Sequence, residues 1–324
     1  MKRQKQYFLG IDGGGTKTTA LILSSDGKIM GKGKSGSADI FNTSSEEVHS
    51  SIEASVNEAV KKSKISLQDC DYAVFGLPAA EMTDDIDKKL EKIVKQITNT
   101  PLDIVNDVRV ALEGAHPLGV GAIILAGTGS MVLAKDQNNN VYRVDGWGEH
   151  VGDQGSAYYI GRRALIAIFE SIDGRGRETL IKDKVQKKMN ISNFNELAIR
   201  CKGNNVRKFI ASFAEIVCEA AEEGDITAQI ILRMANNELQ RSLLAVKFNV
   251  LKTSLPVSAV GSVFKCPYLL KEFKKSIEEN EQFFELKPAE FSPEIGATIM
   301  AAKKILEPEE IDTLINRLKN EQSK

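Results

Sequence analysis

The hydrophobic residues near the N-terminus gather in short runs and not in a helical stripe. The runs Tyr7–Ile11 and Thr18–Leu23 flank a glycine-rich segment, and a third run, Lys28–Lys32, follows the turn at residues 24–27. Short apolar runs that are bounded by glycine-rich turns are typical of β-strands. The sequence therefore predicts a β-meander of three strands at the start of the chain.

The pattern then changes to helices that alternate with strands. Ser44 and Glu47 have the spacing of a capping box, and apolar residues follow them at helical spacing. Residues 84–98 carry a second helical stripe, and short apolar runs stand at residues 72–75 and 102–105. Strands that alternate with helices after a meander predict an α/β layer with a mixed sheet.

The same order of elements begins again after residue 119. The runs Val120–Leu125 and Met131–Ala134 flank a second turn of glycines and hydroxyl residues, and Val141–Val144 follows. We interpret this half as a duplication of the first architecture. The remaining expected elements are helices from about 156 to 248, strands at 257–260 and 283–286, and helices at 293–306 and 311–318.

Composition limits the class of protein. The 324 residues carry a formal net charge of −1, which gives no indication of nucleic-acid or membrane binding. The sequence has no apolar run of about 18 residues that would span a membrane, and the N-terminal run is too short for a signal peptide. We expect a cytoplasmic protein of about two domains that binds neither nucleic acid nor membrane.

Four cysteines are spread along the chain, at Cys70, Cys201, Cys218 and Cys266. No pair has the C-x-x-C spacing of a metal site. We expect all four to be reduced, because disulfides are rare in cytosolic proteins.

The first glycine-rich turn has the chemistry of a phosphate cradle. Without side chains, its three glycines leave backbone N–H groups free to point at an anion. A carboxylate at the mouth of the turn could hold a hydrated divalent cation. The turn lacks the spacing of a P-loop or of a dinucleotide fingerprint, and a plain hairpin turn is the alternative. The residues are Asp12 for the cation and Gly13, Gly14, Gly15, Thr16 and Lys17 for the phosphates.

Two further segments suggest that a nucleotide is gripped from both halves of the chain. The turn Thr128-Gly129-Ser130 would take the other end of a triphosphate. Gly261 and Ser262 follow a predicted strand, where the absence of a side chain lets a flat base lie against the backbone.

Asp107 is the strongest catalytic candidate. It follows a predicted strand of the first half and precedes the second half, where a carboxylate could accept a proton from a substrate hydroxyl. The alternative is that Asp107 caps a helix at residues 108–114.

The segment from Gly146 to Ser156 is too glycine-rich for a regular element and contains the only tryptophan, Trp147. Carboxylates and glycine-backed amides beside an aromatic ring suit a small polyhydroxylated ligand. We assign Asp153 to the ligand hydroxyls, with a helix cap near Ser156 as its alternative. His150 is more simply a surface residue than a metal ligand.

These segments resemble one family in their order along the chain. DGGGTKT, Asn106-Asp107, AGTGS, DGWGEHVGDQGSAYYI, AVGSVFK and EIGA are similar to the sugar kinase/hsp70/actin superfamily. Within it they resemble the N-acetylglucosamine kinases of the BadF/BadG/BcrA/BcrD ATPase branch, over nearly the whole chain. The resemblance implies an α/β fold of duplicated ribonuclease H-like (actin-like ATPase) domains, each with a mixed five-stranded sheet, and an ATP cleft. Residues 1–115, joined by a helix at about 307–324, would form one domain, and residues 116–306, with a helical insertion, the other.

The resemblance implies transfer of the γ-phosphate of ATP to the 6-hydroxyl of N-acetylglucosamine, with Asp107 as general base. Mg²⁺ would be held by Asp12 through water, and a homodimer is expected. Thr16 and Thr128 match phosphate contacts, and Ala211, Gly261 and Ser262 match the surroundings of adenosine. The sugar contacts would be Gly146, Trp147, Gly148 and Asp153, with Asp39, Asn42 and Gly76 from loops of the first domain.

Those first-domain loops depart from the family pattern. Ser37-Ala38-Asp39 stands where the family often has Asn, and the sequence LPAAE follows Gly76. Because these loops should surround the 3-hydroxyl and the N-acetyl group, N-acetylmuramic acid and glucosamine stay open as substrates. Two other classes also stay open: an ATPase that activates a radical enzyme through a cysteine-held iron–sulfur cluster, and a non-catalytic sugar sensor.

Overall fold

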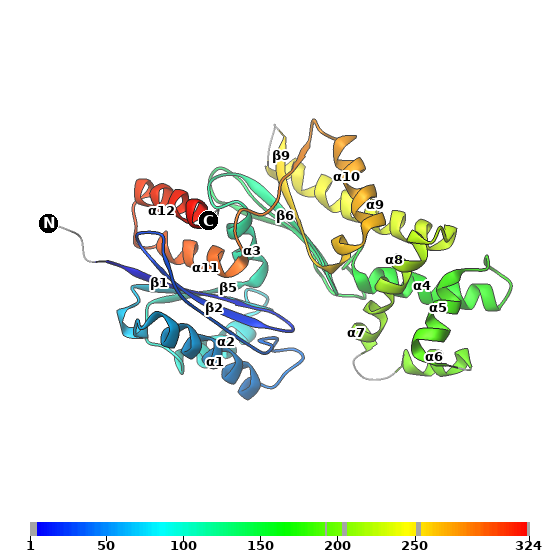
Figure 1. Cartoon of the computed structure of the whole chain (residues 1–324), viewed down its shortest axis with the longest axis horizontal. Coiled ribbons are helices and arrows are strands. Elements are labelled where there is room, and N and C mark those ends of the chain that lie inside the picture. The colour runs from blue at the N-terminus through cyan, green and yellow to red at the C-terminus, as the bar shows by residue number, and fades with distance from the viewer. Residues whose placement is uncertain (1–4, 192, 203–205, 251–253, 323–324) are drawn as a thin grey trace. The chain divides into compact units, whose positions relative to one another are not determined.

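The computed structural model describes residues 5–191, 193–202, 206–250 and 254–322 (Figure 1). The chain divides into two compact units, residues 1–119 with 289–324 and residues 120–288. Among the described residues, no helix is long and apolar enough to cross a membrane.

The first unit is built on a five-stranded mixed sheet in the order β3-β2-β1-β4-β5. Its first three strands form the predicted antiparallel meander, and β4 and β5 run parallel to β1. The strands are β1 (Tyr7–Gly13), β2 (Thr18–Ser24), β3 (Ile29–Ser35), β4 (Tyr72–Leu77) and β5 (Leu102–Asn106).

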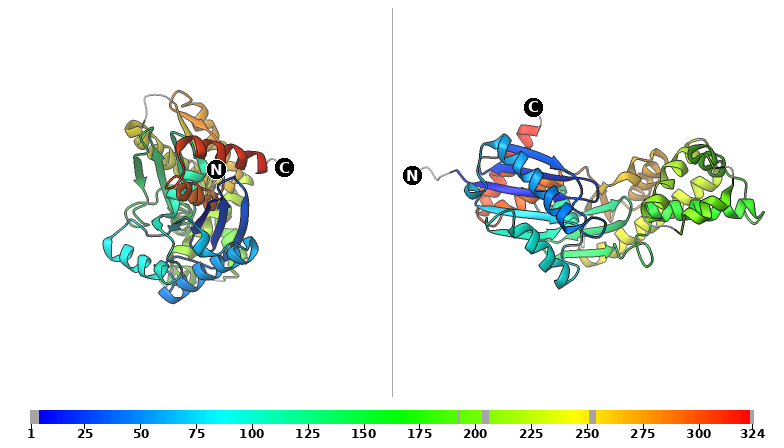
Figure 2. Two further views of the ribbon diagram at one scale, coloured as in Figure 1. Left: turned by 90° about the vertical axis from the view of Figure 1, so that its left-hand side faces the viewer. Right: turned by 90° about the horizontal axis from the view of Figure 1, so that it is seen from below.

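Helices cover both faces of this sheet because buried side chains alternate along its strands. Leu9 and Ile11 pack under α1 and α2, whereas Phe8 packs on the opposite face against α11 and α12. The left view of Figure 2 shows the blue strands between α1 and the red helices α11 and α12. The helical elements are α1 (Ser45–Ser63), η1 (Leu67–Asp69), α2 (Asp84–Lys95), α3 (Asp107–Ala115), α11 (Pro293–Ala302) and α12 (Pro308–Gln322).

Two glycines bring α11 into the first unit. A Cβ atom on Gly10 of β1 would lie 2.5 Å from the backbone nitrogen of Thr298, and one on Gly296 would lie 2.1 Å from the carbonyl oxygen of Val110. Backbone can approach this closely only where the side chain is absent. The expected boundary at residue 306 assigned this helix to the second domain, whereas the structure packs it on β1 and α3.

The second unit repeats the arrangement with the sheet order β10-β9-β6-β7-β8. An antiparallel meander is again followed by two parallel strands, so the predicted duplication is confirmed. The strands are β6 (Gly121–Ala126), β7 (Ser130–Lys135), β8 (Val141–Asp145), β9 (Leu255–Val260) and β10 (Phe284–Leu286). The helical elements are α4 (Ala157–Ile172), α5 (Leu180–Met189), α6 (Phe194–Arg200), α7 (Val206–Ala211), α8 (Phe213–Glu222), α9 (Ile226–Val250), η2 (Ser262–Lys265) and α10 (Pro267–Glu278).

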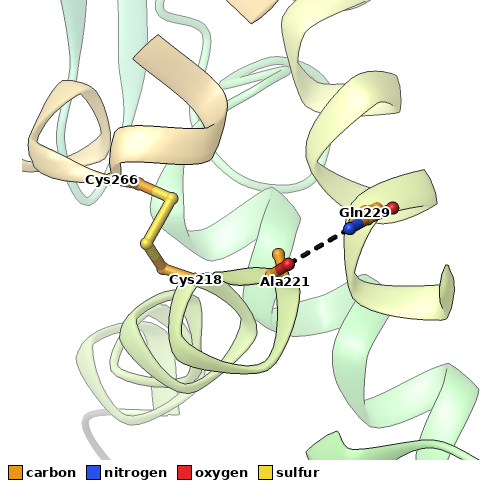
Figure 3. Close-up of a disulfide and its surroundings, with 4 residues drawn as sticks. All are labelled: Cys218, Ala221, Gln229 and Cys266. Atoms are coloured by element: carbon orange, nitrogen blue, oxygen red, sulfur yellow. Dashed lines mark hydrogen bonds between the residues drawn. A yellow bond between two sulfur atoms is a disulfide. The ribbon is translucent and has the colours of Figure 1, made fainter. Parts of the chain in front are cut away.

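A disulfide joins Cys218 of α8 to Cys266, which directly precedes α10 (Figure 3). The expectation that all four cysteines are reduced is therefore wrong for this pair. The two residues are 48 positions apart in sequence, and only the packing of α8 and α10 brings their Cα atoms to 5.7 Å. Cys70 and Cys201 are free.

Candidate functional site

Asp12 and Asp107 lie at one edge of the first sheet. The parallel strands β1, β4 and β5 end together, with Asp12 beside Gly76 and Leu77 beside Asn106. Asp107 is the first residue of α3, directly after β5. Because the carboxyl ends of parallel strands meet at one edge, residues 95 positions apart in sequence bring their charges into one neighbourhood.

Burial shifts both carboxyl groups toward neutral pH. It raises the pKa of Asp107 to about 6, with a further contribution from the charge of Asp39. It raises the pKa of Asp12 to about 7, and the charges of Asp107 and Glu294 raise it further. A carboxyl group whose pKa is close to the working pH is suited to proton transfer.

The helix cap at α3 is supplied by Asn106 and not by Asp107. The side-chain oxygen of Asn106 accepts the N–H of Val108 at 3.1 Å. An Asp107 carboxylate oxygen accepts the same N–H at 3.0 Å, which orients it and opposes the rise in its pKa. The alternative that Asp107 caps this helix is therefore wrong, because the cap is the preceding residue, Asn106.

The loop after β4 fastens the start of α3. Glu81 accepts the backbone N–H of Asn106 at 3.2 Å and pairs with the guanidinium of Arg109. Asn106 in turn donates its side-chain amide to the carbonyl oxygen of Ala80 at 3.4 Å. Sequence reasoning singled out the LPAAE loop only as a departure from the family and missed the clamp by Glu81.

Lys32 and Glu294 form an ion pair in the neighbourhood of Asp12. Burial alone would raise the pKa of Glu294, but hydrogen bonds from Lys32 and a backbone N–H hold it below its ordinary value. Glu294 therefore stays charged and contributes to the raised pKa of Asp12. The EIGA segment was noted in the sequence, but this role for its glutamate was not.

The first glycine-rich turn closes as a β-hairpin. The N–H of Gly14 donates to the carbonyl oxygen of Lys17 at 2.8 Å, and its own carbonyl oxygen accepts the N–H of Ala38 at 3.0 Å. Gly15, Thr16 and Lys17 are exposed at its tip. Gly13 is explained by packing, since a Cβ atom there would lie 2.9 Å from side chains of Ala38 and Leu77.

Asp39 joins the hairpin to the residues expected to contact sugar. A Cβ atom on Gly15 would lie 3.7 Å from a carboxylate oxygen of Asp39. The same carboxylate accepts the side-chain amide of Asn42 at 2.6 Å, so these two residues form one polar group. Gly76 is buried, and a Cβ atom there would lie 2.4 Å from Val110, so packing of α3 accounts for this glycine.

In the second unit the turn between β6 and β7 is tied to the start of α4. The N–H of Gly127 donates to the carbonyl oxygen of Gly129 at 2.8 Å. The N–H of Ala157 donates to the carbonyl oxygen of Gly127 at 2.8 Å, and Thr128 is exposed at the tip. The predicted phosphate residues therefore form a hydrogen-bonded corner in which Thr128 is exposed and Ser130 is buried.

Asp153 lies against this corner. Its carboxylate accepts the N–H of Ser130 at 3.2 Å and pairs with the guanidinium of Arg207 at 2.5 Å. Burial raises its pKa, whereas the charge of Arg207 lowers it. Ser156 caps α4 through the N–H of Tyr159, so the cap alternative for Asp153 is wrong.

Arg207 is a residue that sequence reasoning missed. Its guanidinium also lies 3.2 Å from Glu149, and a Cβ atom on Gly129 would lie 2.7 Å from one of its nitrogens. Arg207 therefore places a positive charge directly on the turn. Arg207 lies on α7, a segment that has neither a glycine-rich turn nor a strand pattern to mark it in the sequence.

Asp145 organises the glycine-rich loop that follows β8. Its carboxylate accepts the backbone N–H groups of Gly146, Asp153 and Gln154 at 2.8, 2.8 and 2.9 Å. Gly146 and Gly148 have φ of +78° and +92°, conformations that favour glycine. Trp147, a predicted sugar contact, is exposed, and His150 is exposed as expected for a surface residue.

A cavity of about 480 Å³ lies between α4, α8 and η2 in the second unit. Ala211 and Ser262, two of the residues assigned to adenosine, are among its lining residues. Gly261 has a φ of +118°, and a Cβ atom there would lie 2.1 Å from the carbonyl oxygen of Ala126, so only glycine fits beside β6. Ala157 lines the same cavity and donates its N–H to Gly127 of the turn, so the start of α4 contacts both.

Comparison with known proteins gives relatives of matching length. The chain is 30% identical over 302 residues to the N-acetylmuramic acid/N-acetylglucosamine kinase of Clostridium acetobutylicum. This alignment covers 91% of this chain and 98% of that protein. It is 27% identical over 314 residues to the N-acetyl-D-glucosamine kinase of Dictyostelium discoideum, with 92% and 98% covered.

A solved structure shares the fold. A candidate N-acetylglucosamine kinase from Chromobacterium violaceum superposes with a TM-score of 0.77 at 21% identity, over 91% of this chain and 98% of that one. Residues 9–301 match the BadF/BadG/BcrA/BcrD ATPase family, a range that includes nearly all of both sheets and the carboxylates described above. This chain therefore belongs to the BadF/BadG/BcrA/BcrD ATPase family.

Proposed function

We propose that this protein is an ATP-dependent amino-sugar kinase that transfers the γ-phosphate of ATP to the 6-hydroxyl of N-acetylglucosamine. The observation that carries the proposal is the position of the half-buried Asp107 at the carboxyl edge of the first sheet, where its pKa of about 6 suits a general base at neutral pH. The relatives named above as amino-sugar kinases match the chain over nearly its whole length, which supports the substrate class.

Asp107 would take the proton of the sugar hydroxyl as that oxygen attacks the γ-phosphorus. The backbone N–H of Val108 orients one carboxylate oxygen, and the Glu81 clamp fixes the start of α3. Rigid support of this kind keeps the reacting oxygen in line, and positioning supplies much of the catalysis in phosphoryl transfer.

ATP is assigned to residues of both units. Gly13–Lys17 and Thr128–Ser130 would contact phosphates, while Ala211, Gly261 and Ser262 would surround adenosine. Mg²⁺ in kinases is held by one or two carboxylates together with phosphate oxygens. Asp12 fits this requirement, because it is half-buried near other acids and a cation would stabilise its charged form. When bound, the ion supplies charge neutralisation on the phosphates.

Sugar hydroxyls are assigned to Asp39 and Asn42 of the first unit and to Asp153 and the loop Gly146–Gly148 of the second. N-acetylmuramic acid is a second candidate substrate, since the Clostridium acetobutylicum relative is named for both sugars.

A coupled assay of ADP release tests the proposal. The purified protein is given MgATP and, in turn, N-acetylglucosamine, N-acetylmuramic acid, glucosamine, N-acetylmannosamine and glucose. We expect release that depends on N-acetylglucosamine, with phosphorus coupling to the C6 protons of the product in NMR spectra. Release that no sugar stimulates would contradict the kinase proposal, and iron in the purified protein would favour the radical-enzyme activator.

A further inference from the structure

We propose that Cys218 and Cys266 form a thiol–disulfide site that controls how tightly the second-unit cavity binds adenine nucleotides. The inference rests on the proposed nucleotide role of that cavity. Both cysteines are among the residues that line it, together with Ala211 and Ser262. The redox state of the pair therefore changes the wall of the cavity itself.

The disulfide crosslinks two parts of that wall. Cys218 lies on α8, two residues after the buried Ile216. Cys266 follows η2, the short helix that begins at Ser262 and packs through Val263 and Phe264. Figure 3 shows the bond reaching from the α8 ribbon to the segment before α10. With the bond in place, α8 and the segment that follows η2 are covalently tied, and both line the cavity.

Reduction would change the width of the cavity. Bonded sulfur atoms lie about 2.05 Å apart, and two thiols need a considerably larger separation to avoid overlap. Cys266 is buried, with 8% of its surface exposed, and it lines the cavity, so its thiol either turns into the cavity or displaces η2, and both change the cavity. We expect α8 and η2 to shift after reduction. The cavity is preformed in the oxidised protein, whereas in the reduced protein the ligand has to order it.

The pair is chemically accessible from one side. Cys218 is only partly buried, so the thiolate of a small dithiol can attack its sulfur. That step forms a mixed disulfide and releases the Cys266 thiolate, which is then protonated. The second thiol of the reagent displaces Cys218, leaving two cysteine thiols and one oxidised cyclic disulfide of the reagent. A small-molecule disulfide would carry out the reverse two-electron oxidation.

The test compares nucleotide affinity in the two redox states of the whole chain. Protein is treated with oxidised or reduced dithiothreitol, and free thiols are counted by mass spectrometry after alkylation. Binding of ADP and of a non-hydrolysable ATP analogue is then measured by calorimetry. We expect two free thiols and tight binding after oxidation, and four free thiols with a Kd raised about fivefold after reduction, because preorganisation of the cavity is lost.

Variants separate the pair from the other cysteines. Cys201→Ser should keep the full redox response, because Cys201 is free and lies outside the cavity lining. The double variant Cys218→Ser/Cys266→Ser should bind with the affinity of the reduced protein in both conditions.

Equal affinities in the two verified states, or four free thiols after oxidation, would overturn this inference. If sugar-dependent ADP release persists in either case, the proposed kinase function stands. Absence of nucleotide binding in both states would overturn the nucleotide role of the cavity as well.

Discussion

At the scale of single residues, the proposed function depends on the carboxyl group of Asp107. Its pKa of about 6 arises from burial first and from the charge of Asp39 second. A base works in its ionised form, so a raised pKa limits activity on the acidic side of neutrality. The same burial means that ionisation of this group costs free energy in the folded state.

The first prediction concerns the pH dependence of the reaction. We expect kcat/KM for the sugar to be level above pH 7 and to fall about tenfold per unit below pH 6, as Asp107 takes up a proton. Initial rates from pH 5 to 9, with the coupling enzymes in excess, measure the profile. A level profile down to pH 5 would show that Asp107 is not the base.

The second prediction concerns Asp107→Asn. Loss of a general base lowers kcat by about 10²–10⁴-fold, while sugar binding measured by calorimetry should persist. A carboxyl group with a raised pKa contributes most stability when protonated and loses that contribution as pH rises through about 6. The variant should therefore melt at a higher temperature than the parent at pH 8, with a smaller difference at pH 5.

The third prediction concerns Arg207, which neutralises the buried carboxylate of Asp153. Arg207→Met should raise the pKa of Asp153 further, because burial then acts without the opposing charge. We expect a lower melting temperature and a higher KM for the sugar. Arg241→Met is the matched control, since Arg241 is exposed and pairs with Glu238 one helical turn away. If the two variants have the same melting temperature and the same KM, Arg207 does not contribute to the site.

At the scale of elements, local sequence determined the strands and the first helix. The capping box of Ser44 and Glu47 begins α1 as expected, and its apolar stripe is buried. The two meanders also formed where short apolar runs flank glycine turns. These features could be predicted because each depends on residues that are neighbours in sequence.

Contacts between distant segments could not be predicted in this way. Asn106, and not its acidic neighbour, caps α3, and either side chain is a good cap by local rules. The clamp by Glu81, the Arg207–Asp153 pair and the disulfide all join elements 25 to 54 residues apart. The packing of α11 on β1 and α3 depends on Gly10 and Gly296, which no local pattern connects.

The fourth prediction tests that packing. A methyl group on Gly296 would lie 2.1 Å from the carbonyl oxygen of Val110 and 2.4 Å from the nitrogen of Gly114, both on α3. Gly296→Ala should therefore destabilise the protein by about 1–3 kcal/mol and reduce kcat, because α3 carries Asp107. Urea denaturation measures the first effect. Ser50→Ala, at an exposed position of α1, should leave the free energy of unfolding and kcat unchanged.

At the scale of the whole molecule, each unit has its own sheet and its own buried core. Nucleotide and sugar are assigned to separate sets of segments. We therefore expect each ligand to protect different backbone amides from hydrogen exchange. This distinction allows a test that needs no substitution.

The fifth prediction uses hydrogen exchange. ADP should slow amide exchange at residues 127–130, 157–160, 211–218 and 262–266, since bound ligands stabilise the segments that they contact. Residues 95–101, which line a separate cavity of about 580 Å³ in the first unit, provide the internal control. Protection at residues 95–101 instead of 211–218 would place the nucleotide elsewhere.

Trp147 gives the molecule a natural optical probe. It is the only tryptophan, it is 66% exposed, and the guanidinium of Arg143 lies 4.4 Å from the centre of its ring. Excitation at the red edge of the indole band therefore reports on one loop and on nothing else in the chain. A ligand that covers this ring should shift its emission to shorter wavelength, so occupancy of the loop can be followed in unlabelled protein.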